Sequence, residues 1–193
     1  MSREGKSALF EVKSVAAGSP AALAGIQPGD QIISINGEPL IDYVDYVYFC
    51  AQEKLRFYVL RGSSKLKLRA RNDDGGDLGL EFTQPLLAKK RVCGNRCIFC
   101  FVEQLPKGMR RSLYLKDEDW RYSLVFGNYV TLSDISKKEF NRILRRKASP
   151  LYISVHTVDE ALRRRMLGNP RGLAIRPMLR KIAARGMRFH AQA

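Results

Sequence analysis

Three cysteines lie close together near the middle of the chain, and together they could bind a metal centre. Cys93, Cys97 and Cys100 follow the spacing Cys-x3-Cys-x2-Cys, which lets one short loop present three sulfur atoms to a single site. Three thiolates suit an iron–sulfur cluster better than a structural zinc site, which normally takes four protein ligands. One iron would then lack a protein ligand and be open to chemistry. The alternative is a zinc site that His156 or His190 completes.

The length and composition of the chain limit the class of protein and the cellular compartment in which such a loop could work. The 193 residues suffice for two modest domains, and no apolar run reaches the ~18–20 residues of a membrane helix. The first residues carry no apolar signal segment, so we expect a cytoplasmic protein rather than a secreted one. Clustered cysteines in a reducing compartment indicate metal binding rather than disulfides.

The net charge of +15 is concentrated in one half of the chain. Residues 1–84 carry 10 Lys and Arg against 11 Asp and Glu, whereas residues 85–193 carry 24 against 8. Such a basic half attracts anions such as RNA or an acidic protein. Many of these side chains fall on predicted helices, among them 142–147 and 163–165, where a solvated basic face is the simpler explanation. Nucleic-acid binding is therefore not favoured.

The first half predicts a small β-rich unit. Strands are expected at 8–15, 31–35, 55–60 and 65–69, and Ser19 and Gly25 bracket a short helix. Asn36-Gly37 predicts a tight turn. A second helix over 42–52 is expected to pack through one face, formed by Val44, Val47, Tyr48 and Ala51.

The second half alternates strands and helices, which predicts a parallel sheet. Strands are expected at 86–92, 124–126, 151–155 and from 187 onward, with helices over 135–147, from 157 to Gly168, and over 174–185. Polar loops after parallel strands gather at one edge, so the cysteine loop, Gly127-Asn128 and His156 should converge. Residues 116–121 hold three consecutive acids and predict a solvated loop. The alternative is that these carboxylates bind a metal or act as a catalytic base.

Several turn and cap signals of the first half recur in the order typical of bacterial PDZ domains, which the chain resembles at residues 18–21, 24–26, 28–32 and 35–37. This resemblance implies that a peptide is bound as an added strand at a sheet edge. A Gly-Leu-x-Phe-like loop usually holds the peptide carboxylate, and the candidate here supplies Gly79, Leu80 and Phe82. It lies at the end of the module rather than its start, and the alternative is a strand leading into the next domain.

The cysteine loop, with Phe99 before its last cysteine, resembles the signature of the radical S-adenosylmethionine (radical SAM) enzymes. The resemblance implies that the three cysteines bind three irons of a [4Fe–4S] cluster and that the fourth iron chelates S-adenosyl-L-methionine. It places Phe99 beside the adenine and Gly127-Asn128 at the amino group of the cofactor. Residues after later strands would reach the ribose or carboxylate: Ser154, His156, His190 and Gln192. For the two histidines the alternative is a substrate-facing or structural role.

The combination of a PDZ-like module and, directly after it, this loop resembles a known family. Its members are iron–sulfur oxidoreductases that join PDZ and radical-SAM-like domains to a C-terminal domain of unknown function. The fold class expected is α/β overall: a small PDZ-like β-rich (α+β) domain at 1–84, then a partial radical-SAM-type (β/α) barrel at 85–193. A six-unit barrel needs on the order of 180 residues, so we expect this chain to be truncated.

By this resemblance the protein would cleave S-adenosylmethionine reductively to a 5′-deoxyadenosyl radical that acts on an unknown substrate. An electron donor such as flavodoxin or ferredoxin would serve it, and the PDZ-like module would dock a peptide or protein. The alternative is a non-catalytic PDZ adaptor with a structural or redox-sensing iron–sulfur or zinc site. Its basic surface would bind RNA or an acidic partner.

Overall fold

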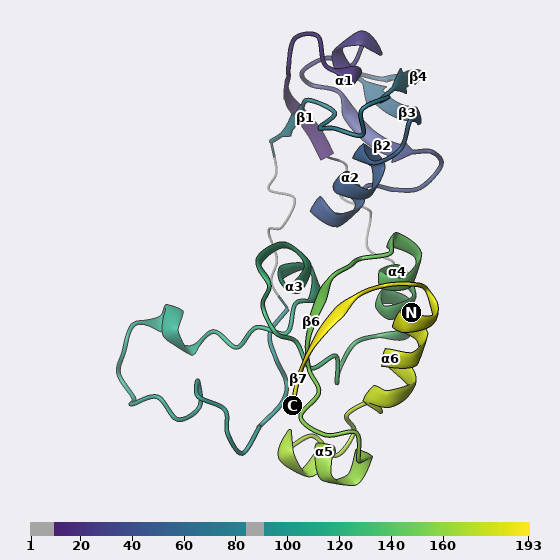
Figure 1. Cartoon of the computed structure of the whole chain (residues 1–193). Coiled ribbons are helices and arrows are strands. Elements are labelled where there is room, and N and C mark those ends of the chain that lie inside the picture. Colours follow the sequence, from purple (N-terminus) through teal and green to yellow (C-terminus); the bar gives the residue numbers. More distant parts are fainter. Residues whose placement is uncertain (1–9, 84–90) are drawn as a thin grey trace, which may run out of the picture. The chain divides into compact units, whose positions relative to one another are not determined.

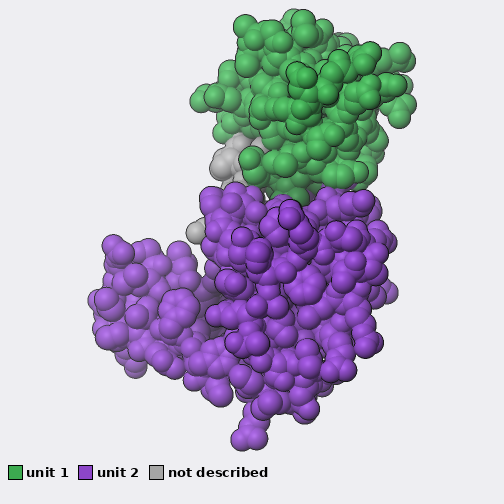
Figure 2. All heavy atoms as spheres, in the orientation of Figure 1, with its two compact units in different colours: residues 1–88 green, residues 89–193 purple. Residues whose placement is uncertain are grey.

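The computed structural model describes residues 10–83 and 91–193 and divides the chain into two compact units, residues 1–88 and 89–193 (Figure 1, Figure 2). The elements of the first unit, in chain order, are β1 (Phe10–Val15), α1 (Pro20–Leu23), β2 (Gln31–Ile35), α2 (Tyr43–Cys50), β3 (Lys54–Arg61), β4 (Ser64–Arg71) and β5 (Leu80–Phe82). The strand predicted at 86–92 falls largely outside the described residues.

One antiparallel sheet organises the first unit, in the order β4-β3-β2-β1-β5. The last strand in sequence thus lies beside the first, at the edge of the sheet. Ser19 caps α1 by accepting a hydrogen bond from the Ala22 amide, and Pro20 opens that helix, as predicted. Asn36 and Gly37 both adopt positive φ, which confirms the predicted turn.

A single hydrophobic core fills this unit, and it includes the buried side chains Val12, Ile32, Phe49, Phe57 and Leu78. The predicted packing face of α2 is confirmed at Val44 and wrong at Val47 and Ala51, which are exposed. The helix buries Val44, Tyr46, Phe49 and Cys50, whereas Val47 is 45% exposed. The reason is that the larger side chains Tyr46 and Phe49 fill the core on the other positions of the helix.

The second unit contains short helices and a parallel strand pair. Its elements are η1 (Arg111–Tyr114), α3 (Trp120–Phe126), α4 (Lys137–Arg146), β6 (Leu151–Ser154), α5 (Glu160–Met166), α6 (Ile175–Ala184) and β7 (Phe189–Gln192). β6 and β7 pair in parallel, and Val130 forms a parallel bridge to Ile153 on the other side of β6. In Figure 1, α4 and α6 lie to one side of the pair and α3 to the other.

The strand predicted at 124–126 is wrong, because these residues complete α3. Asp119 caps this helix at its start, accepting from the Arg121 amide, and Gly127 ends it in the left-handed conformation. Helix capping at both ends decides against the strand. The sheet position is taken four residues later, by Val130. The fold class nevertheless stands: an antiparallel β-rich unit is followed by an α/β unit with parallel pairing.

The remaining predicted helices are confirmed with small shifts at their starts. Ser136 caps α4, which begins at Lys137 rather than at 135, and Asp159 caps α5. The expected solvated basic faces are wrong for three arginines of these helices. Arg142, Arg146 and Arg163 are 5%, 7% and 3% exposed. The Arg163 guanidinium donates to backbone carbonyls of this unit, and that of Arg142 lies over the Trp120 ring.

Candidate functional site

A cavity of about 650 Å³ in the second unit brings together most of the predicted site residues. In Figure 2 the surface of this unit is deeply hollowed beside the lobe at the left, which corresponds to the outlying teal segment of Figure 1. The predicted residues that line the cavity are Cys93, Cys97, Phe99, Cys100, Gly127, Asn128, Ser154, His156 and Gln192. His190 is not among them, and its ring stacks on Tyr152 with centroids 4.5 Å apart.

The cavity forms where parallel strands end. Thr131 follows the bridge at Val130, Ser154 ends β6, and Gln192 ends β7, and all three line the cavity. Side chains at the carboxyl ends of parallel strands meet at one edge of the sheet. The predicted convergence is therefore found, although Gly127 and Asn128 reach the cavity from the end of a helix rather than of a strand.

The backbone of the cysteine loop is fastened to the end of α5. The amides of Arg96 and Ile98 donate to the carbonyls of Leu167 and Met166, both at 3.0 Å. Gly168 makes this approach possible, because a Cβ on it would lie 2.1 Å from the Arg96 carbonyl oxygen. A short helix far along the chain thus fixes the position of the three thiols.

Asn95, inside the cysteine loop, anchors the loop from below. It is 1% exposed, and its Nδ2 donates to Thr131 Oγ1 at 2.9 Å. Its Oδ1 accepts from Ser133 Oγ and from Asn169 Nδ2, each at 2.8 Å. A buried amide with all of these partners rigidifies the segment that carries it. Asn95 therefore holds the loop to the strand-like segment at 130–133.

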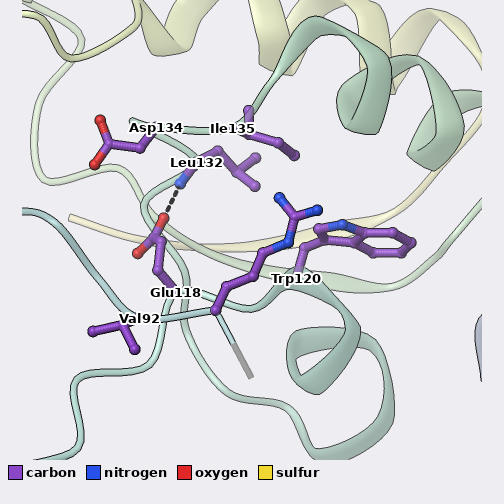
Figure 3. Close-up of a pocket in the computed structure, with 7 residues that line it drawn as sticks. Val92, Glu118, Trp120, Leu132, Asp134 and Ile135 are labelled. Carbon is purple, nitrogen blue, oxygen red and sulfur yellow. Dashed lines mark hydrogen bonds between the residues drawn. The ribbon is translucent and has the colours of Figure 1, made fainter. Parts of the chain in front are cut away.

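Glu118 lies in the wall between the cysteine cavity and a second cavity of about 330 Å³, shown in Figure 3. Its Oε1 accepts from the Leu132 amide at 2.6 Å and from Thr131 Oγ1 at 2.7 Å. Burial raises the pKa of Glu118 more than these hydrogen bonds lower it. The solvated loop predicted at 116–121 is wrong, since Asp119 is also buried and caps α3.

Arg163 ties the strand ends together beneath the cavity. Its guanidinium donates to the carbonyls of Val155, Ser154 and Thr131, at 2.9, 3.0 and 2.8 Å respectively. It is a buried cation whose hydrogen bonds are made to backbone oxygens. The side chain satisfies carbonyls that the short strands leave without a ladder partner.

The electrostatics of the thiols reflect their burial. Burial raises the pKa of the Cys93 thiol to about 11, and burial together with the nearby Cys100 raises that of Cys97. Lys116 lines the same cavity, and its Nζ donates to Glu103 Oε1 at 2.6 Å and to the Asn95 carbonyl. Its ammonium partly offsets the negative charge that ionised thiols would bring.

Within residues 10–83 and 91–193, no group of three or more His, Cys, Asp or Glu side chains is arranged to hold a metal ion. The chemistry of the donor set nevertheless fits an iron–sulfur cluster. Three thiols line one cavity, and the nearby acids are engaged elsewhere, Glu118 with Thr131 and Leu132. Soft thiolates without hard oxygen ligands are the donors that such clusters take.

Phe99 and His156 form an aromatic pair on the cavity wall, with centroids 4.6 Å apart. His156 has φ +59°, an uncommon conformation for a residue other than glycine. Burial, assisted by the charge of Arg163, lowers the pKa of His156. The imidazole is thus neutral at pH 7 and offers a flat ring face and one N–H donor.

Sequence reasoning missed four residues that build this site: Asn95, Lys116, Glu118 and Arg163. Asn95 lies inside the cysteine motif, and that placement was the available signal. Lys116 and Glu118 lie in the acidic stretch, which the sequence gave no reason to bury. Arg163 could not have been separated from its exposed neighbours Arg164 and Arg165 without the tertiary contacts.

The candidate peptide site of the first unit lies on β5. This strand pairs with β1, and no other described strand pairs with its far edge. Gly79 precedes it with φ +78°, and a Cβ there would lie 2.3 Å from the Ser19 Cβ. Only glycine fits this position. Phe82 packs edge-on against Tyr46 of α2, with centroids 5.6 Å apart.

Fold and site together define a two-domain protein: an antiparallel module with a free edge strand, then an α/β unit whose cysteine loop opens on a cavity at the strand ends. Residues 72–193 match the family model described as a Radical SAM-like domain, and residues 11–61 match that of a PDZ domain. The chain belongs to the Radical SAM-like domain family and carries a PDZ domain before it.

Solved structures similar to this chain include two PDZ domains of SdrC-like proteins. That of Listeria innocua is 18% identical and covers 39% of this chain and 94% of its own, with a TM-score of 0.34. That of Listeria monocytogenes is 19% identical and covers 42% and 93%, also with a TM-score of 0.34. No curated protein matches the chain. None of the described helices is both long and apolar enough to cross a membrane.

Proposed function

We propose that the second unit is a radical SAM-type iron–sulfur enzyme domain in which Cys93, Cys97 and Cys100 bind three irons of a [4Fe–4S] cluster. The observation that carries the proposal is the single cavity lined by all three thiols and by residues from three later segments. When bound, the cluster and S-adenosyl-L-methionine supply reductive cleavage of the sulfonium, with a substrate that is unknown. Membership in the Radical SAM-like domain family supports this chemistry.

The chain's own residues would orient and shield the cofactor. Phe99, paired with His156, offers a flat surface for the adenine ring. Gly127 and Asn128 also line the cavity, and they would meet the amino group of S-adenosylmethionine. The Asn128 side chain already donates to Asp117 at 2.8 Å, so it is held in place.

Residues at the strand ends would contact the ribose or the carboxylate. Ser154 and Gln192 hydrogen bond each other at 3.3 Å across β6 and β7, and both line the cavity. His156 would donate its single N–H there. His190 does not line the cavity, and its ring stacks on that of Tyr152. The Tyr152 ring lies 3.5 Å from where a Cβ on Gly127 would be, so His190 would affect the cofactor only by positioning Tyr152 beside Gly127.

The PDZ domain supports a peptide or protein partner. We propose that the partner is an extended segment that adds to the free edge of β5, with Gly79, Leu80 and Phe82 as its contacts. We further propose a domain boundary near residue 84, a cytoplasmic setting that keeps the thiols reduced, and a one-electron donor such as flavodoxin or ferredoxin.

Anaerobic reconstitution with iron and sulfide tests the enzyme proposal. We expect roughly four Fe and four sulfide per chain, and 5′-deoxyadenosine from S-adenosylmethionine and dithionite. Cys97→Ala should lose the cluster, whereas Cys50→Ala, at the buried cysteine of the first unit, should keep the full iron content. Iron retained in Cys97→Ala, or zinc bound in place of iron, would overturn the proposal.

A non-catalytic role is the second candidate, in which the same thiols hold a structural or redox-sensing site. It is favoured by the exposed basic side chains of α5 and α6, namely Arg164, Arg165, Arg176 and Arg180. In that case the chain would bind iron or zinc but leave S-adenosylmethionine intact. The exposed arginines of α5 and α6 would then bind RNA or an acidic partner, in a manner that weakens steeply with added salt.

A further inference from the structure

In the loop before β5, the side-chain carboxylate of Asp77 accepts hydrogen bonds from the same domain. The Gly79 amide donates to Asp77 Oδ1 at 2.6 Å. The hydroxyl of Tyr46, which comes from α2, donates to the same oxygen at 3.1 Å. That hydroxyl also accepts from the Leu80 amide at 3.3 Å. Two successive backbone donors are thus satisfied by one carboxylate and one phenol.

The Leu80 amide faces the side of the edge strand away from β1, toward Tyr46. The Gly79 carbonyl accepts from Ala16, and the Thr83 amide donates to Glu11, so these groups point toward β1. Because backbone groups alternate along an antiparallel strand, Leu80 lies with its amide turned away from β1, toward α2. This is the side on which a further strand would add.

We propose that Asp77 is an internal ligand of the PDZ domain, which occupies the carboxylate end of its peptide groove and which a partner's C-terminal carboxylate must displace. This inference rests on the proposed peptide docking at β5. The expected partner is therefore a peptide or protein whose free C-terminal carboxylate can compete with the Asp77 side chain for this end of the groove.

The participation of Tyr46 distinguishes this arrangement from a simple local turn. A turn closed by an aspartate side chain needs no partner from elsewhere in the chain. Here a side chain 31 residues away supplies the second hydrogen bond, and its ring, 4% exposed, packs against Phe82. Burial raises the pKa of the Tyr46 hydroxyl, which therefore keeps its proton and acts as a donor to Asp77.

Asp77 itself is exposed, so it can be removed or displaced without opening the core. Without its carboxylate, the amide of Gly79 and the hydroxyl of Tyr46 would be free to bind a carboxylate from solution. Charge-assisted hydrogen bonds of this kind are about twice as strong as neutral ones. The tethered carboxylate should therefore weaken binding of any competing terminus by about tenfold or more.

The test uses the full chain, labelled with 15N, and sodium acetate as the carboxylate probe, with sodium chloride at equal ionic strength as the blank. In Asp77→Ala we expect saturable acetate-dependent shifts of the Gly79 and Leu80 amide resonances. Wild type and the matched control Asp74→Ala, which removes another exposed acid of the same loop, should show none. Equal shifts in wild type, or no shift in Asp77→Ala, would overturn the proposal.

A second measurement separates this inference from peptide docking itself. Random peptides with a free C-terminal carboxylate, and the same peptides with an amidated C-terminus, are tested for binding to each variant. We expect Asp77→Ala to bind the free-acid set about tenfold more tightly than wild type does. Free-acid binding equal in both variants overturns the internal ligand but supports docking. Acetate shifts with no peptide bound by any variant support the internal ligand and refute docking.

Discussion

The two units of the chain differ in what their interiors contain and in what those interiors stabilise. In the first unit all five strands join one antiparallel sheet over one apolar core, and residues 1–84 are nearly neutral in charge. In the second unit, only a two-stranded sheet is present among the described residues, and Asn95 and Arg163 are buried beside the cavity. The first unit is stabilised by its apolar core. In the second unit, buried polar side chains hold the cysteine loop and the strand ends in place.

Large apolar side chains are exposed in both units, and in the second unit several of them surround the candidate site. Around the cysteine loop several large ones reach solvent, namely Ile98 at 70%, Phe99 at 40%, Phe101 at 77% and Leu115 at 59% exposure. Contiguous exposed apolar residues at a cavity mark a binding surface rather than a finished core. The comparison therefore predicts that damage to the first unit affects folding, and that damage to the second affects the site.

The largest effect is expected from Phe57→Ala in the first unit. Phe57 is 1% exposed in the apolar core, and its loss should cost about 3–5 kcal/mol of unfolding free energy. Circular dichroism in urea would report this loss. Iron uptake by the second unit should be unchanged, and a parallel loss of iron would contradict the division between the units.

Arg163→Met should be nearly as damaging within the second unit. It leaves the carbonyls of Thr131, Ser154 and Val155 buried without their donor, at a cost of about 3 kcal/mol. The chain's single tryptophan, Trp120, is buried in this unit, so its fluorescence follows unfolding there. The control is Arg165→Met on the same helix, which is exposed and should change little.

Asn95→Ala should have an intermediate effect that shows most clearly in the site. Removing this amide breaks hydrogen bonds to Thr131, Ser133 and Asn169, and should cost about 2 kcal/mol. Because the cysteine loop loses its anchor, we expect iron bound after reconstitution to dissociate faster on gel filtration. Iron retention equal to wild type would show that the backbone bonds to α5 suffice.

The smallest effect, and a pH-dependent one, is expected for Asp119→Asn. Although burial opposes ionisation, the hydrogen bonds and charge of Arg121 hold the pKa of Asp119 below its usual value of 3.8. Its contribution is therefore present above pH 3.8 and lost as pH falls through the lowered pKa. At pH 7 asparagine still caps α3 but should cost about 1 kcal/mol. Below the lowered pKa the wild-type and variant Trp120 transitions should coincide.

Sequence patterns predicted what depends on local signals. The cap at Ser19, the turn at Asn36, and most helices of the second half were found because side-chain caps and apolar periodicity act within a few residues. The site residues at Cys93–Cys100 were proposed from spacing, and the structure places them on one cavity. Their roles as ligands stay predictions.

What could not be predicted depends on contacts between distant segments. Residues 124–126 have a strand-like composition, yet capping by Asp119 and Gly127 makes them helical. The burial of Arg163 depends on carbonyls 8 to 32 positions away, which no local pattern encodes. The doubt over Gly79–Phe82 came from their late position in the module. Pairing of β5 with β1 resolves where they lie, at the sheet edge.

The central claim is that three thiols of the second unit hold a cluster with one iron open to S-adenosylmethionine. Electron paramagnetic resonance of the dithionite-reduced, reconstituted chain tests it most directly, with spectra taken before and after adding that cofactor. We predict a reduced-cluster signal whose g values change on addition, because the open iron gains new ligands. An iron–sulfur signal that S-adenosylmethionine leaves unchanged would contradict the account.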